Sequence, residues 1–192
     1  MKKTGKVFLF SGHMIDAPDR SVPRFPADKE KIARKAIEKT LKELHAGADD
    51  LAISSGACGG DLLFAEACLD RGLSFEMRLP FPVPEFLERS VLFADQDWEQ
   101  RFFKVKEHPN TRVYYMQDEL GELPVDENPY EKCNLWMLER AISFGKERVN
   151  FICLWDGKGG DGPGGTRHMI RSIRQRSGYV TILDTNQLFF EE

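Results

Sequence analysis

Two glycine-rich stretches carry the residue types that bind phosphate groups in proteins. They are residues 54–61 (SSGACGGD) and residues 156–166 (DGKGGDGPGGT), and an apolar run comes before each one. Glycine lets backbone N–H groups approach an anion closely, and a helix that starts at the glycines adds partial positive charge. We predict that the two stretches together bind one phosphorylated ligand. A flexible turn is the alternative interpretation of either stretch alone.

The glycine turns contain most of the candidate ligand-binding residues. Those that we expect to contact a phosphate are Gly56, Gly59, Gly60, Gly164, Gly165 and Thr166. Thr166 is also suited to cap the helix that follows it. Asp61 follows the first turn, where it serves as a helix cap or binds a ribose hydroxyl group.

Five further candidates lie outside the glycine turns. Gly12 and His13 end the first apolar run, and Arg24, like Arg20, lies in the proline-containing loop 14–26. The two arginines would supply the positive charge that glycines lack, although solvated loop arginines are equally common. Arg78 lies within a predicted strand, where its charge needs an anion or water. The four histidines have no metal-ligand spacing, so we predict no metal.

The composition limits the class of protein. A chain of 192 residues with 41% hydrophobic and 30% charged residues is typical of one globular domain. A net charge of −4 argues against a broad nucleic-acid-binding surface. The apolar run 7–10 is too short for a signal peptide or a membrane span, and the four cysteines show no C-x-x-C spacing. We therefore expect a cytoplasmic protein with reduced cysteines and without nucleic-acid or membrane partners.

Strand-like and helix-like segments alternate along the chain. The predicted strands are 6–11, 51–54, 74–79, 112–116, 149–155 and 179–183. The predicted helices are 28–45, 62–71, 85–94, 97–107, 130–144 and 167–176. This alternation predicts a single α/β domain with a mostly parallel sheet and helices on both faces.

In such a sheet the loops that follow the strands share the carboxyl edge, where ligands bind. The loops concerned are 12–26, 55–60, 80–84, 117–129 and 156–165. Segment 117–129 is long and acidic, and we predict that it forms a mobile cover over the site. Segment 184–192 is apolar for a chain end, and we expect it to pack on the body or on a partner.

The paired motifs 54–61 and 162–166 (GPGGT), with Asn134 on the helix between them, resemble the SLOG superfamily of Rossmann-like domains. This superfamily includes the lonely-guy phosphoribohydrolases and the DNA-processing protein A proteins. The resemblance covers residues 7 to 173 and implies one Rossmann-like domain over residues 1–192. It also implies a nucleotide whose phosphate and ribose lie at the glycine turns, a role for Asn134 at the sugar, and a homodimer.

The chain departs from the hydrolases of this superfamily in two ways. Its turn 163–166 is one glycine unit shorter than theirs, and it has His168 where those enzymes carry a catalytic Glu two residues after the turn. We therefore predict a nucleotide-sensing branch that binds a nucleotide or NAD-derived ligand as a sensor or carrier, with no cofactor. The alternative is an N-glycosidic hydrolase acting on nucleoside monophosphates, in which Asp61, Asp156 or Asp161 replaces the Glu.

Overall fold

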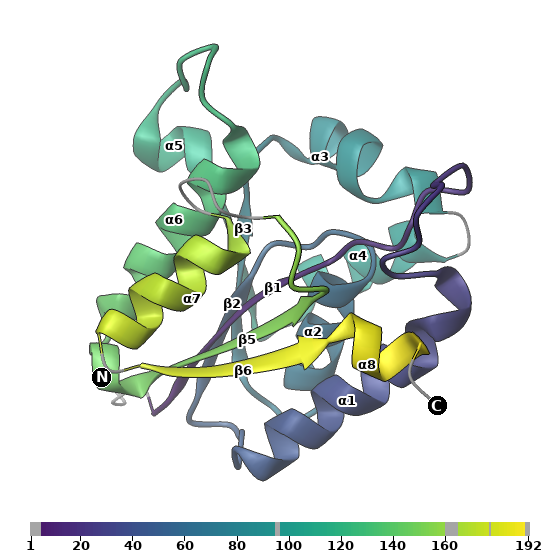
Figure 1. The fold of residues 1–192 in the computed structure, drawn as a ribbon. Helices are drawn as coiled ribbons and strands as arrows, with labels where there is room; N and C mark the ends of the chain where they lie inside the picture. Colours follow the sequence, from purple (N-terminus) through teal and green to yellow (C-terminus); the bar gives the residue numbers. More distant parts are fainter. Residues whose placement is uncertain (1–4, 95–96, 160–164, 177, 191–192) are drawn as a thin grey trace.

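The structure is a computed structural model that describes residues 5–94, 97–159, 165–176 and 178–190. It contains one sheet of six parallel strands, so the predicted α/β domain is confirmed (Figure 1). The strands are β1 (Val7–Gly12), β2 (Leu51–Ser54), β3 (Ser74–Leu79), β4 (Thr111–Tyr115), β5 (Val149–Trp155) and β6 (Tyr179–Asp184). Every one of them lies within one residue of its predicted range.

The order of the strands places a crevice next to β1. Along the sheet they run β4-β3-β2-β1-β5-β6. After β1 the chain builds outward through β2 to β4, and it then returns to add β5 on the other side of β1. In open α/β sheets this reversal of direction opens a crevice at the carboxyl ends of the two strands concerned. Here the two strands are β1 and β5, and the cavity found in the structure is lined by the end of β1 and by no residue of β5.

Helices cover both faces of the sheet (Figure 1). One face packs against α1 (Glu30–Glu43), α2 (Gly60–Leu69), α4 (Trp98–Lys106) and α8 (Thr185–Phe190). The other face packs against α6 (Pro129–Ile142) and α7 (Thr166–Gln175). The shorter helices α3 (Val83–Ser90) and α5 (Met116–Leu120) lie beyond the ends of β3 and β4.

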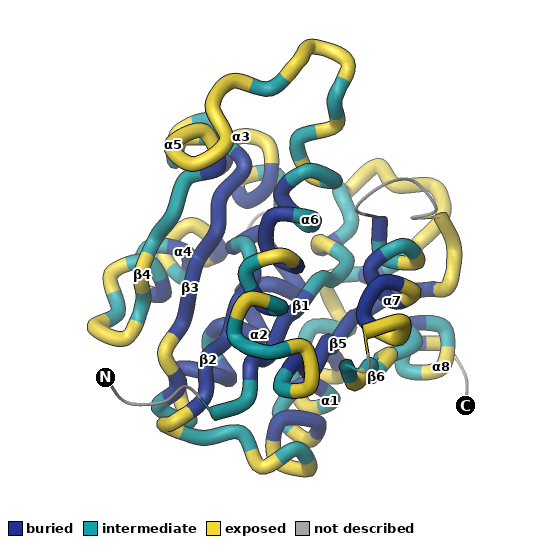
Figure 2. Tube along the Cα trace, turned by 90° about the vertical axis from the view of Figure 1, so that its left-hand side faces the viewer, coloured by how far each residue is buried: buried dark blue, intermediate teal, exposed yellow. Residues whose placement is uncertain are grey.

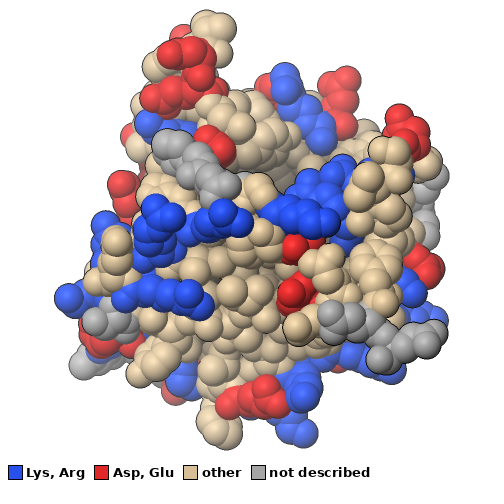
Figure 3. Space-filling view, in the orientation of Figure 1, with Lys and Arg blue, Asp and Glu red and all other residues tan. Residues whose placement is uncertain are grey.

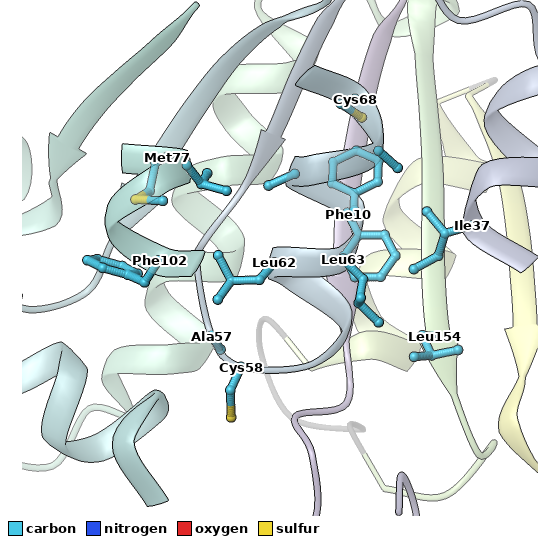
Figure 4. Packing of buried hydrophobic residues seen from close by; sticks show 14 of the residues in the cluster. Phe10, Ile37, Ala57, Cys58, Leu62, Leu63, Cys68, Met77, Phe102 and Leu154 are labelled. Carbon is cyan, nitrogen blue, oxygen red and sulfur yellow. The ribbon is translucent and has the colours of Figure 1, made fainter. Parts of the chain in front are cut away.

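The centre of the molecule is mainly apolar because β5 and α2 are buried along almost their whole length. All seven residues of β5 are buried, as expected for a strand with helices on both faces (Figure 2). Helix α2 is buried along almost its whole length between α1 and α4. Its Leu63 lies beside Phe10 of β1, and the apolar contacts continue to Ile37 of α1 (Figure 4). This packing fixes the turn that joins β2 to α2.

Three predicted segments differ in detail from the structure. Helix α2 begins at Gly60 rather than Leu62, because Gly59 turns the chain with φ of 97°. Segment 117–129 was expected to be a loop, but residues 116–120 form α5. The apolar tail forms α8, in which buried Phe189 stacks on Phe25 at 5.2 Å between ring centroids.

Gly59 is the position in the β2–α2 turn where only glycine fits. Its φ of 97° is strained for other residues, and a Cβ there would lie 2.7 Å from Ile15 N and 3.1 Å from His13 O. We expect Gly59→Ala to lower the free energy of unfolding by about 3 kcal/mol in urea titrations. Gly47→Ala is the control, since no atom lies within 4 Å of its Cβ position. Equal stability of the two variants would contradict this assignment.

Candidate functional site

The loop that follows β1 crosses the crevice and joins both glycine-containing connections. Its His13 N–H donates to Leu154 O of β5 at 3.0 Å, and Ile15 N–H donates to Cys58 O at 3.2 Å. The amide of Gly60 donates in turn to His13 O at 3.1 Å. Residues 13–15 therefore lie between the end of β5 and the first glycine turn, so these two parts of the chain do not close on a ligand directly.

The first glycine turn uses its hydrogen-bond donors within the protein. The carboxylate of Asp61 accepts hydrogen bonds from the Ser55 hydroxyl and from the amides of Ala57 and Gly12. Cys58 N–H donates to Ser90 O at 2.9 Å. The contact of Gly56, Gly59 and Gly60 with a phosphate stays a prediction. The sequence also allowed Asp61 as a helix cap, but its side chain turns back to Ser55 instead.

Asp61 is a buried carboxylate with an altered pKa. It is 7% exposed. Burial raises its pKa and the three hydrogen bonds limit the rise, so that the pKa is about 6. Asp61 is therefore mainly ionised at neutral pH. Among the described residues no Lys or Arg lies within ion-pair distance of it, so its charge is stabilised by hydrogen bonds alone.

His13 lies between Arg24 and Asp156 at the end of β5. The Arg24 Nη2 donates to His13 Nδ1 at 2.8 Å, and His13 Nε2 lies 3.3 Å from Asp156 Oδ1. Because a guanidinium can only donate, Nδ1 accepts from Arg24, and Nε2 faces both the Asp156 carboxylate and the Asp156 backbone N–H, whose nitrogen lies 3.1 Å away. Burial, and then the charge of Arg24, lower the pKa of His13 to about 4. The ring is therefore neutral at pH 7 and bonds to Asp156 without an ion pair.

Carboxylates hold both loop arginines at the mouth of the crevice. Asp16 Oδ1 lies 3.2 Å from Arg20 Nε, and its Oδ2 accepts the amide of Arg24 at 2.8 Å. Asp156 Oδ2 lies 3.6 Å from Arg24 Nε, a buried atom that has no hydrogen-bond partner among the described residues. Burial alone would raise the pKa of Asp156, but the Lys158 amide, His13 and Arg24 bring it below its usual value.

A cavity of about 470 Å³ lies between this loop, Asp61 and the first turns of α6. Its lining includes Asp61, which is 7% exposed and which we call the floor. The lining also includes Arg20 and Arg24, whose side chains are 38% and 37% exposed and which we call the mouth. Lys and Arg side chains gather over the loop after β1 and over α7 on the face shown in Figure 3. The rest of the lining is mainly apolar and aromatic, with Phe10, Phe86, Phe93, Tyr130, Cys133 and Met137.

Five of the predicted site residues line this cavity. They are Gly12, His13, Arg24, Asp61 and Asn134. They come from three separate segments, the end of β1 with its loop, the start of α2, and α6. The common location follows from the parallel sheet, which brings the end of β1 and the β2–α2 turn to one edge, with α6 beside them.

The other predicted residues lie elsewhere or outside the described residues. Within the described residues, Gly56, Gly59, Gly60, Arg78, Gly165 and Thr166 are not part of the cavity wall. Gly56 packs in the core, where a Cβ would lie 3.1 Å from Met77 and 3.2 Å from Phe102. Gly164 and Asp161 lie outside the described residues. The contribution of the second glycine turn to ligand binding stays a prediction.

Arg78 has a structural environment rather than a place in the cavity. It is 2% exposed, and its Nη2 lies 3.0 Å from the buried carboxylate of Glu76. Its guanidinium lies over the rings of Tyr114 and Trp136, at 4.6 and 4.3 Å from their centroids. An internal carboxylate thus supplies the anion that we expected from a ligand.

No strong sequence signal marks the aromatic part of the cavity lining. Tyr130 is 39% exposed at the start of α6, and its hydroxyl is 3.1 Å from Ser90 Oγ. Phe93 lies in the short segment that follows α3. The positions of both residues were an available signal for the site. Tyr130 lies at the start of a helix, and Phe93 lies in the connection that follows β3, whose end is at the predicted ligand edge.

The comparisons with known proteins bear only on the fold of this chain. No protein-family model matches the sequence, and no curated protein matches it significantly. A structure of DNA processing protein A (DprA) from Streptococcus pneumoniae is similar, with a TM-score of 0.43 and 15% identity. The similarity covers 99% of this chain and 63% of the DprA chain, so this chain spans less than two thirds of that protein. The SLOG branch inferred from the glycine motifs stays a prediction.

Within the described part of the chain, every helix is too short or too polar to cross a membrane.

Proposed function

We propose that the protein binds a nucleotide or an NAD-derived phosphorylated ligand in the cavity beside β1, as a sensor or carrier. The observation that supports this proposal most directly is the set of charged and aromatic residues that line the cavity. The cavity is lined by a buried carboxylate, by two partly exposed arginines and by several aromatic rings. A nucleotide carries the complementary groups in one molecule. Its phosphate is an anion, its base is aromatic, and its hydroxyl and amino groups are hydrogen-bond donors.

The floor of the cavity favours a hydrogen-bond donor on the ligand. Asp61 accepts a hydrogen bond from the Ser55 hydroxyl, and the backbone amides of Ala57 and Gly12 also stabilise its charge. Because its two oxygens offer about four acceptor positions, a ribose hydroxyl or a base amino group could also donate to it. Such a bond is strong because the carboxylate is charged and largely removed from water.

The mouth of the cavity favours an anion. Each arginine is oriented by an aspartate, and Arg24 retains a buried Nε without a hydrogen-bond partner among the described residues. That Nε faces Asp156 Oδ2 at 3.6 Å, whereas 37% of the Arg24 side chain remains exposed. A phosphate would contact this exposed part of the guanidinium. The base would then lie against Tyr130 and Phe93, whose rings offer the stacking surface that nucleobases prefer.

A ligand panel tests this function. We expect AMP or ADP-ribose to raise the unfolding temperature in a thermal-shift assay, and adenosine or inorganic phosphate alone to raise it much less. The difference arises because only the nucleotides contact both the floor and the mouth of the cavity. If none of AMP, ADP-ribose, NAD⁺ and the other common nucleotides raises the unfolding temperature at millimolar concentration, the proposed function is wrong.

The position of Asp61 also supports a second candidate, the hydrolysis of an N-glycosidic bond. A carboxyl group with a pKa of about 6 in a cavity is suited to exchange a proton near neutral pH. This function predicts that the free base is released from nucleoside monophosphates, which chromatography would detect, and that Asp61→Asn abolishes the release. Binding without release of the base would leave the carrier function alone.

A further inference from the structure

Helix α7 presents three arginines that have no acidic partner within the part of the chain that the structure describes. Its segment 166–176 contains four Arg and no Asp or Glu. Arg171, Arg174 and Arg176 are exposed, and none of them lies within ion-pair distance of a carboxylate among the described residues. We call these three side chains the basic face of α7. The apolar side of the helix, with Met169 and Ile173, is buried against the sheet.

This basic face departs from the charge pattern of the other helices. Ion pairs one turn apart connect Arg34 to Glu38 in α1 and Glu85 to Arg89 in α3. In α7 the spacing of three residues between Arg171 and Arg174 places like charges side by side, which costs about 0.2–0.5 kcal/mol per pair. An uncompensated row of this kind indicates an anionic partner outside the chain.

Residues 117–128 carry the opposite charge, and we call them the acidic arm. The arm contains five Asp or Glu and no Lys or Arg. It extends away from the body above α6 in both ribbon and tube views (Figures 1 and 2). Val125 near its tip is fully exposed, and Leu120 is 44% exposed. No residue of the acidic arm lines the cavity. The position of the arm therefore does not support its predicted role as a cover over the site.

Only part of the arm's charge is neutralised within the chain. Glu119 accepts a hydrogen bond from Trp136 Nε1 at 2.8 Å, and Glu127 pairs with Lys132 at 3.0 Å. Asp118, Glu122 and Asp126 are exposed and have no ion pair with the described residues. Three unpaired acids in the arm therefore match three unpaired arginines on α7.

We propose that two copies of this chain associate through these surfaces, with the acidic arm of each copy lying on the basic face of α7 in the other. The arm and α7 are both visible on the face shown in Figure 3, with acidic side chains at the top and basic ones below. A two-fold axis between them would bring each arm onto the other copy's helix and close the assembly as a dimer. The overall charge of −4 favours this occupant over a polyanion, which the rest of the surface would repel.

Salt and charge reversal test this interface. Sedimentation velocity in 0.1 M NaCl is expected to show a dimer that dissociates in 1 M NaCl, because the screening length falls from about 10 Å to about 3 Å. The variant R171E/R174E and the variant E122K/D126K are each expected to be monomeric in 0.1 M NaCl. Mixing the two variants in equal amounts restores the dimer, since both of its contacts are then complementary again.

Circular dichroism confirms that the variants are folded, and R171Q/R174Q replaces the first variant if it is not. A wild-type monomer in 0.1 M NaCl at about 100 μM chain, or a mixture of variants that stays monomeric, would overturn the proposal. A monomeric wild type that binds an oligonucleotide, with binding lost in R171E/R174E, would assign the basic face to nucleic acid instead. The nucleotide panel is independent of these outcomes, because the cavity and α7 are separate surfaces.

Discussion

Arg24→Leu is expected to weaken the binding of AMP or ADP-ribose by about a hundredfold, the equivalent of losing a charge-assisted contact worth about 2–3 kcal/mol. Arg24 lies at the mouth of the cavity with a buried Nε that has no hydrogen-bond partner among the described residues. In our account a phosphate oxygen accepts from this side chain. Isothermal titration calorimetry measures the change directly.

Two controls separate loss of the contact from loss of the fold. Arg112→Leu removes an exposed arginine from β4 at the far edge of the sheet, and we expect it to leave the affinity unchanged. Adenosine has no phosphate, so Arg24→Leu should bind it as the wild type does. If Arg24→Leu binds AMP as tightly as the wild type, the phosphate does not lie at Arg24.

The second large effect is on the pH dependence of stability. Burial raises the pKa of Asp61 from 3.8 to about 6, so the folded state binds more protons than the unfolded state between these values. The contribution of Asp61 to stability is therefore lost as the pH rises from about 4 to about 6. Burial lowers the pKa of His13 from 6.5 to about 4, so its contribution is gained as the pH rises through nearly the same range. Each amounts to about 3 kcal/mol, and the two oppose each other.

Removing one of these two groups should therefore make the pH dependence of stability that the other group causes measurable. We expect the free energy of unfolding of Asp61→Asn, relative to wild type, to increase by about 3 kcal/mol between pH 4 and pH 6.5. For His13→Gln we expect a relative decrease of similar size over the same range. Urea titrations at several pH values give both difference curves, and their slopes are unaffected by any constant loss of stability. Two flat curves would contradict the environments assigned to Asp61 and His13.

The sequence predicts the strands well because their signal is strong and local. The run of apolar residues 149–155 fits only a strand buried on both sides, and the structure has β5 at these residues. The helix starts are less certain, as α2 shows. Asp61 is a favourable cap residue, but Gly59 had already turned the chain, and Asp61 bonds to Ser55 instead. That choice depends on Gly12, which lies 49 residues earlier and is not visible in a local pattern.

The candidate site could be predicted only in part, for the same reason. Parallel topology placed Gly12, His13, Arg24 and Asp61 at one edge, and the cavity includes all four. The sequence could not show that the donors of the first glycine turn are used by Asp61, Ser90 and His13 of the same chain. Arg78 illustrates the same difficulty, because its partner Glu76 is two residues away in sequence and on the same side of the strand. In both places the partner is a group of the same chain.

The most direct test is a crystal structure of the protein with the nucleotide that gives the largest thermal shift. We predict that its phosphate lies within hydrogen-bond distance of Arg24, that its base lies against Tyr130 or Phe93, and that one of its donors reaches Asp61. Density for the nucleotide only at the start of α7, around Gly165 and Thr166, with an empty cavity, would contradict this account.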